Sequence, residues 1–97
     1  MRGQELLTFV IYDIVDDLVR GRVANACKDY GLERIQYSAF SGSLDASRRG
    51  ALATRLADTL GEEIGRILVL PVCEKDAHAK RELVNEPQAR ARDGAHG

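Results

Sequence analysis

Three acidic residues follow an apolar run in the stretch "FVIYDIVDD", which extends from Phe9 to Asp17. A carboxylate at this place has two possible roles. At the start of a helix it accepts hydrogen bonds from free backbone amides, and beside a phosphate it holds a hard cation such as Mg²⁺. Asp13 is open to both interpretations. Of Asp16 and Asp17, we expect one to cap a helix and the other to lie in solvent or pair with Arg20.

Arginine dominates the basic residues, with eleven Arg against three Lys in a chain of net charge −1. The net charge argues against a protein that binds nucleic acid over its whole surface, but it leaves room for a local basic face. Arg is the better bidentate ligand for phosphate. Arg48 and Arg49 are candidates for phosphate-backbone contacts, which depend on salt and not on base sequence. For each alone, a solvated helix face is the simpler interpretation.

Hydrophobic spacing predicts the elements that position these residues. The apolar run Leu6 to Tyr12 predicts a central strand, and helical spacing follows from Asp16 or Asp17 until Gly31. Residues 33–40 alternate as a strand that is either bent or part of a tight strand pair. Residues 45–61 predict a second helix, and residues 67–72, "ILVLPV", predict a strand whose proline favours an edge.

One residue breaks the alternation of the segment 33–40. Phe40 falls on the polar side with Arg34, although a large apolar side chain is unusual there. We expect either a bulge that turns Phe40 inward or burial of its ring against a second subunit.

The order of elements predicts an α+β, ferredoxin-like βαββαβ fold with two helices on one face of an antiparallel sheet. Because no further helix is available for the other face, a sheet-to-sheet homodimer is the simplest way to cover it. Residues 1–85 are expected to form one domain and residues 86–97 a disordered tail. The segment after Cys73 predicts a helical turn, a short edge strand at 82–85, or both.

The composition predicts a cytoplasmic protein that makes no membrane contact. No apolar stretch approaches the roughly 20 residues of a membrane-spanning helix, and the start "MRGQELLTF" lacks a secretory signal. The two cysteines fit a reducing compartment, with Cys27 in the core and Cys73 at a strand end.

Three stretches, "VIYDIVDDLVRGRV", "GLERIQYSAFSGSL" and "RILVLPVCEK", together resemble the CRISPR-associated protein 2 family, in register from about Leu6 to Glu74. The resemblance implies a ferredoxin-like homodimer whose C-terminal strand packs on the partner's sheet. It also implies a metal-dependent endonuclease, using Mg²⁺ or Mn²⁺, that acts on RNA or DNA. A second implied role is that of a central dimer in spacer acquisition, bound to an integrase subunit and double-stranded DNA.

The resemblance assigns roles to individual residues. Asp13 matches the family's metal ligand, and two copies of Asp13 across a two-fold axis would share one ion. The implied catalytic set is Asp13, Arg20, Arg34 and Phe40, and the predicted nucleic-acid contacts are Arg20, Arg22, Arg34, Arg48 and Arg49. Three functions stay open: a Mg²⁺-dependent endonuclease, a non-catalytic scaffold that bridges integrase subunits, and, less favoured, a toxin-type ribonuclease of the same fold.

Overall fold

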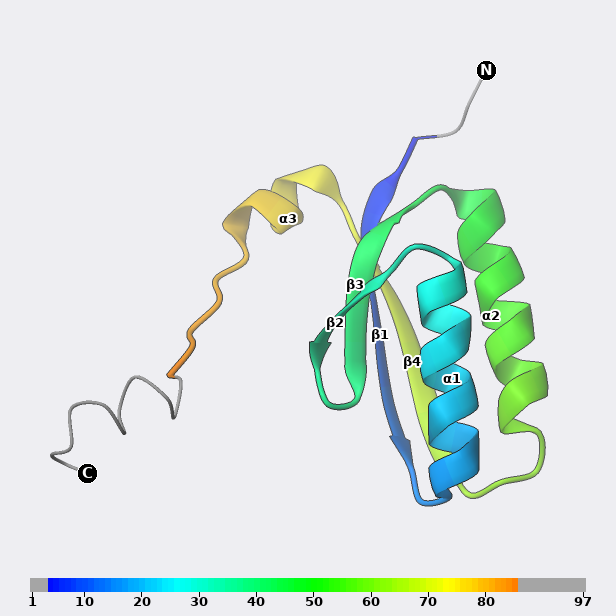
Figure 1. Ribbon diagram of the computed structural model, residues 1–97. Helices are drawn as coiled ribbons and strands as arrows, with labels where there is room; N and C mark the ends of the chain where they lie inside the picture. Colours follow the sequence, from blue (N-terminus) through cyan, green and yellow to red (C-terminus); the bar gives the residue numbers. More distant parts are fainter. Residues whose placement is uncertain (1–3, 86–97) are drawn as a thin grey trace, which may run out of the picture.

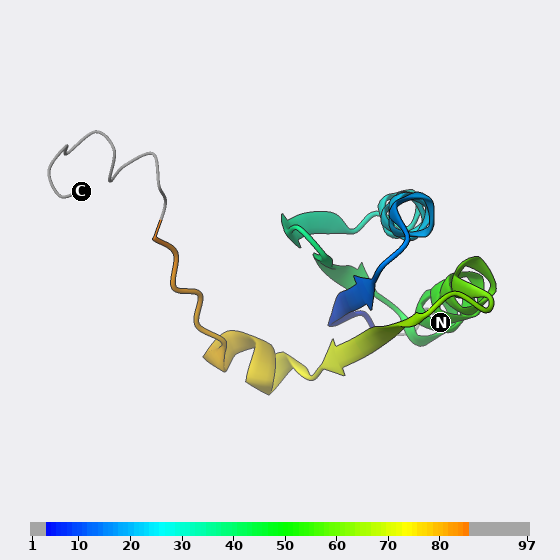
Figure 2. The same cartoon turned by 90° about the horizontal axis from the view of Figure 1, so that it is seen from below.

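The computed structural model describes residues 4–85 of the chain (Figure 1). Its elements, in chain order, are β1 (Leu6–Ile14), α1 (Asp17–Asp29), β2 (Glu33–Gln36), β3 (Ala39–Leu44), α2 (Ala46–Leu60), β4 (Gly65–Val72) and α3 (Glu74–Ala79). The strands form one sheet in the order β2-β3-β1-β4, and all neighbours are antiparallel. Helices α1 and α2 lie on the same side of this sheet (Figure 2). The predicted ferredoxin-like arrangement is confirmed.

The core lies between the sheet and the two long helices. Alternate side chains of the central strand β1, including Val10 and Tyr12, are buried on this side. They meet a buried stripe from α1 and the fully buried Leu52 of α2. Burying one large aliphatic side chain contributes about 1.5–3 kcal/mol. Cys27 belongs to this core, and burial raises the pKa of its thiol to about 11, so it is neutral at physiological pH.

Both long helices begin at an aspartate, as the sequence predicts. The Asp16 carboxylate accepts a hydrogen bond of 2.9 Å from the Val19 amide. Asp45 accepts one of 2.8 Å from the Arg48 amide at the start of α2. Each bond satisfies a backbone donor that the first turn of a helix leaves free.

The structure corrects two boundaries near the candidate site. Strand β1 does not end at Tyr12 but continues to Ile14, because β4 begins at Gly65 and pairs along its full length. The segment 33–40 is a strand pair, and a register shift between Arg34 and Gln36 interrupts its alternation. The bulge leaves Phe40 opposite Arg34 and turned into the core, where its exposure is 0%.

The C-terminal part of the described chain is helical and then irregular. Helix α3 realises the predicted helical turn, and the described residues contain no strand at 82–85 in this single chain. The edge position predicted from Pro71 is confirmed, since β4 borders the sheet. The predicted tail 86–97 lies outside the described residues. Among the described residues, no helix is long and apolar enough to cross a bilayer.

Candidate functional site

The Asp13 carboxylate lies on the face of the sheet that carries no long helix, hereafter the open face. Its neighbours Tyr12 and Ile14 are buried on the helix side, whereas Asp13 is exposed. Across the strand pair, the Cα of Asp13 is matched with that of Arg66. Asp13 forms no hydrogen bond or ion pair with any described residue. Its oxygens are therefore available to a ligand.

A shallow hollow of about 260 Å³ lies beside this carboxylate. It is lined by Asp13, Val15, Ile64, Gly65 and Arg66. Val15 and Ile64 are 77% and 80% exposed. The hollow therefore combines one acid, one base and an apolar rim.

The part of the open face formed by β1 and β4 is otherwise apolar. Phe9, Ile11, Leu68 and Leu70 occupy neighbouring positions of β1 and β4 on this side. Ile11, Leu68 and Leu70 are 44%, 51% and 44% exposed. Contiguous apolar surface of this kind on a sheet is typical of an interface. The charged pair Asp13 and Arg66 lies at one end of it.

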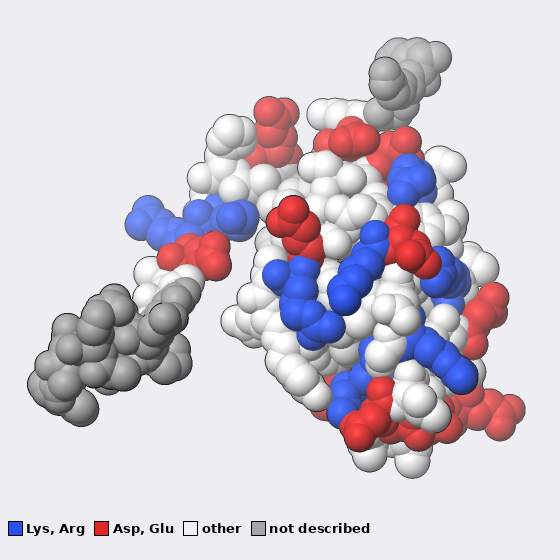
Figure 3. Space-filling model, in the orientation of Figure 1, with Lys and Arg blue, Asp and Glu red and all other residues white. Residues whose placement is uncertain are grey.

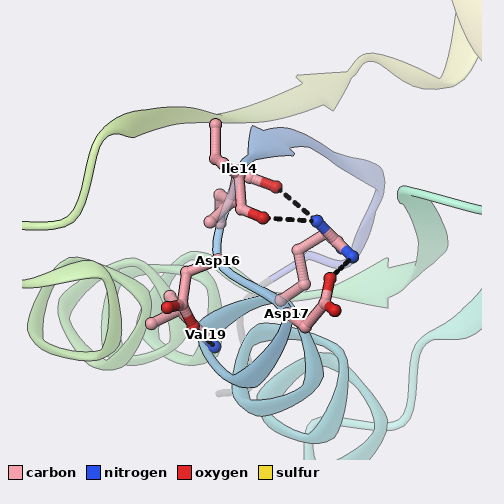
Figure 4. A network of polar contacts seen from close by, with 6 residues as sticks. Ile14, Asp16, Asp17 and Val19 are labelled. Carbon is pink, nitrogen blue, oxygen red and sulfur yellow. Dashed lines mark hydrogen bonds and ion pairs between the residues drawn. The ribbon is translucent and has the colours of Figure 1, made fainter.

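Arg20 holds the loop that follows Asp13 (Figure 4). From α1, one guanidinium nitrogen donates to the carbonyl oxygens of Ile14 at 2.8 Å and Val15 at 2.9 Å. The other nitrogen pairs with Asp17, which confirms the predicted pairing. The guanidinium thus fixes the chain next to Asp13 through the backbone.

Replacing Arg20 with Ala is expected to lower the free energy of unfolding by about 2 kcal/mol, because two carbonyls lose a charged donor. Urea denaturation monitored by circular dichroism measures this change. Arg22→Ala is the matched control: its side chain is exposed and makes no hydrogen bond or ion pair with a described residue, so a change within about 0.5 kcal/mol is expected. Equal effects of the two substitutions would contradict this role of Arg20.

A second hollow, of about 330 Å³, lies on the helix side between α1 and the β2–β3 turn. It is lined by Tyr12, Asp17, Arg20, Gly21, Ala24, Arg34 and Tyr37. The Arg34 guanidinium donates to the Tyr37 carbonyl and lies 4.9 Å from the Phe40 ring centre. Burial raises the pKa of the Tyr12 phenol above its usual value, although the charge of Arg34 opposes the shift. Tyr12 is therefore a neutral hydroxyl at physiological pH.

The residues that the resemblance groups as catalytic thus separate in space. Arg20 and Arg34 meet at the second hollow, whereas Asp13 lies on the open face. Phe40 is fully buried, and its ring stacks with that of Tyr12 at a centroid distance of 6.4 Å. Phe40 has no surface in this fold with which to touch a nucleic acid.

The predicted phosphate contacts on the helices are spread out. Arg48 lies over the Tyr30 ring at 4.9 Å, and Arg49 donates to the Leu44 carbonyl at 3.2 Å. Seen from the side of Figure 1, basic and acidic side chains are interspersed over the molecule (Figure 3). This view contains no continuous basic stripe, so the nucleic-acid role of Arg22, Arg48 and Arg49 stays a prediction.

Sequence reasoning missed Arg66 and Gly65. The predicted strand began at Ile67, so both residues fell into the preceding loop. The only local signal is that Gly65 and Arg66 directly precede an apolar run. That Arg66 lies opposite Asp13 depends on strand register, which is a long-range property.

One chain supplies a single carboxylate to a possible metal site on the open face. Mg²⁺ and Mn²⁺ prefer oxygen donors, and Mg²⁺ commonly takes one or two carboxylates with waters and phosphate oxygens. Residues 4–85 contain no group of three or more His, Cys, Asp or Glu side chains suited to a metal ion. The Asp13 carboxylate is thus the type of ligand that such a cation prefers. A second carboxylate would complete the number of protein ligands that the cation commonly takes.

Comparison with known proteins gives consistent matches. The family model described as "CRISPR associated protein Cas2" matches residues 6–80. A CRISPR-associated endoribonuclease Cas2 of Desulforudis audaxviator is 46% identical over 76 residues, which cover 78% of this chain and 72% of the relative. One of Archaeoglobus fulgidus is 37% identical over 70 residues, covering 72% of this chain and 74% of the relative.

A longer relative and two solved structures add to this. A Thermoproteus tenax protein named as a fusion of endonucleases Cas1 and Cas2 is 32% identical over 93 residues, 91% of this chain and 35% of that protein. A hypothetical protein from Thermus thermophilus superposes with a TM-score of 0.72 at 31% identity, covering 86% of this chain and 94% of that one. Streptococcus pyogenes Cas2 superposes with a TM-score of 0.68 at 23% identity, and the match covers 81% of this chain and 100% of that one. This likeness shows a shared fold.

Proposed function

This chain belongs to the CRISPR-associated protein Cas2 family, and from that premise we propose that it is a homodimeric endonuclease that takes part in spacer acquisition. The observation that carries the proposal is the exposed Asp13 carboxylate, which has no partner among the described residues and lies at the end of an apolar sheet face. The substrate class is the phosphodiester bond of RNA or DNA. The endoribonuclease names of the relatives favour RNA.

The apolar open face supports association with a second copy. A two-fold axis brings the same residues of both chains to one interface, so Leu68 and its neighbours would be covered by their own counterparts. A two-fold axis that runs parallel to β1 would bring the two copies of the charged end toward each other. The two Asp13 carboxylates would then provide two anionic ligands for one hard cation, whereas a single chain provides one. Strand exchange by the C-terminal segment would extend this interface.

Each residue of the implied catalytic set has a separate role in the proposed function. Bound Mg²⁺ or Mn²⁺ would polarise a phosphate oxygen and lower the pKa of bound water. Asp13 would hold the cation. Arg20 holds the loop after Asp13 by hydrogen bonds to its carbonyls. Arg34 donates to a carbonyl of the β2–β3 turn and packs over the buried Phe40 ring. Arg20 therefore supports the site through the backbone, and Arg34 supports the fold around Phe40.

Replacing Leu68 with Glu is expected to weaken the homodimer by about 100-fold or more, because an unpaired charge would be buried at the interface. Sedimentation velocity over a dilution series measures the association, and cleavage should fall in proportion to the dimer. Leu18→Glu on α1 is the matched control, since Leu18 is 70% exposed and lies away from the open face. An unaffected dimer in the Leu68 variant would refute association through this face.

A second candidate function is a non-catalytic scaffold. It is favoured by the Thermoproteus tenax relative, in which a Cas1 and a Cas2 portion are parts of one chain by its name. Under this function the dimer would bridge integrase subunits and contact double-stranded DNA through basic side chains. Asp13 would then be dispensable for spacer acquisition.

A further inference from the structure

We infer that Arg66 binds phosphate at the Asp13 site, donating from β4 to the non-bridging oxygens of the phosphodiester that reaches Asp13. The inference rests on the proposed function, because it names the protein group that holds the substrate of the same site. It concerns the binding of a nucleic-acid phosphate and needs no metal ion.

Strand register places Arg66 at the site. Its Cα is the partner of the Asp13 Cα in the antiparallel β1–β4 pair, and directly paired residues project to the same face of a sheet. Both side chains are exposed and line the same hollow of about 260 Å³. Asp13 and Arg66 are the charged residues among its five lining residues.

The guanidinium of Arg66 is available for a ligand. It makes no hydrogen bond or ion pair with any described residue, and it does not pair with Asp13. Asp13 and Arg66 form no ion pair with each other, and both line the hollow of about 260 Å³. A phosphodiester suits this guanidinium, because its non-bridging oxygens can accept a bidentate pair of charge-assisted hydrogen bonds from Arg.

A glycine fixes this register at the end of the sheet. A Cβ atom added to Gly65 would lie 2.7 Å from the Asp13 carbonyl oxygen and 2.9 Å from the Ile14 Cγ1 atom. A side chain there would push β4 away from β1. Gly65 thus allows the backbone of β4 to pair closely with the last residues of β1. This pairing places Arg66 directly opposite Asp13.

The two other arginines of the implied catalytic set, Arg20 and Arg34, are bonded elsewhere. Arg20 bonds two loop carbonyls and Asp17. Arg34 bonds the Tyr37 carbonyl and lies on the helix side over Phe40. Arg66 is therefore the arginine that shares the hollow of Asp13. Arg also suits the task, since its planar fork matches two oxygens of one phosphate.

The test measures binding without metal and cleavage with metal. In EDTA, the affinity of an end-labelled single-stranded RNA is followed by fluorescence anisotropy over a series of salt concentrations. Arg66→Ala is expected to weaken binding about tenfold and to lower the salt slope by about one for each phosphate that is no longer neutralised. Arg66→Lys should keep the slope and lose part of the affinity, because the charge stays and the planar fork is removed.

Controls separate this inference from the proposed function. Lys28→Ala, the same loss of charge at the exposed far end of α1, should leave affinity and slope unchanged. Asp13→Asn in EDTA should bind RNA at least as tightly as the unmodified protein, because a repulsive charge is gone. If Arg66→Ala binds like Lys28→Ala, the inference is overturned whatever Asp13→Asn does to cleavage.

A second readout addresses the competing explanation. Sedimentation velocity is expected to show an intact dimer for Arg66→Ala. A dimer weakened to the same extent as RNA binding would mean that Arg66 pairs with an acidic group of the second copy, and it would overturn phosphate binding. Weakened RNA binding by Arg66→Ala together with undiminished cleavage by Asp13→Asn would instead count against the nuclease function alone.

Discussion

Replacing Asp13 with Asn is expected to lower the rate of metal-dependent cleavage of RNA or DNA by at least about 100-fold. This loss corresponds to about 2.7 kcal/mol less transition-state stabilisation. The amide keeps the size of the side chain and lacks the anionic oxygen that a hard cation requires. Because Asp13 makes no hydrogen bond or ion pair with a described residue, fold and stability should not change. The rate of cleavage at saturating Mg²⁺ measures the effect, and EDTA should abolish the activity of the unmodified protein.

The matched control is Asp58→Asn, which makes the same change at an exposed position of α2. It should cleave at the unmodified rate. Undiminished, EDTA-sensitive cleavage by Asp13→Asn would place the metal elsewhere. Spacer acquisition by the same variant separates the two candidate functions: acquisition at the normal level without cleavage would establish the scaffold role as sufficient.

Replacing Phe40 with Ala should reduce the free energy of unfolding by about 3–5 kcal/mol, since removal of a fully buried ring leaves a cavity. The substitution also removes the ring contact with Tyr12 and the surface over which Arg34 lies. A domain of this size is typically stable by only about 5–15 kcal/mol. The substitution would therefore remove much of the free energy of unfolding. The midpoint of urea unfolding measures the change.

Phe40→Leu keeps most of the buried volume and should retain most of the stability, while Leu18→Ala truncates an exposed side chain and should cost little. Cleavage by the folded fraction of Phe40→Leu should stay near the unmodified rate. A large loss of cleavage in a stable Phe40→Leu protein would show that the ring acts on the substrate, and it would contradict a purely supporting role.

Local signals explain most of the fold that the sequence predicts. The caps at Asp16 and Asp45 depend on residues three positions away, and the apolar spacing of each helix depends on neighbours one turn apart. The central strand was predicted from its continuous apolar run. These interactions have short range along the chain, so the sequence displays them directly.

The candidate site was predicted only in part. Asp13 stood out because charge follows an apolar run, and the place of Phe40 on the polar side of the alternation indicated a bulge, which the structure confirms between Arg34 and Gln36. The alternation left two alternatives for Phe40, a bulge or burial against a second subunit, and only the strand register decided between them. The burial of Phe40 followed from the register shift.

Which side of the sheet each residue faces was decided by the tertiary structure. The sequence alone determined one central strand, two helices capped by aspartate and the place of Asp13 directly after an apolar run. Pairing of β1 with β4 then placed Arg66 beside Asp13, and packing of α1 took Arg20 to the loop carbonyls. Residues about fifty positions apart become neighbours only through register, and register is set by the whole sheet and its core.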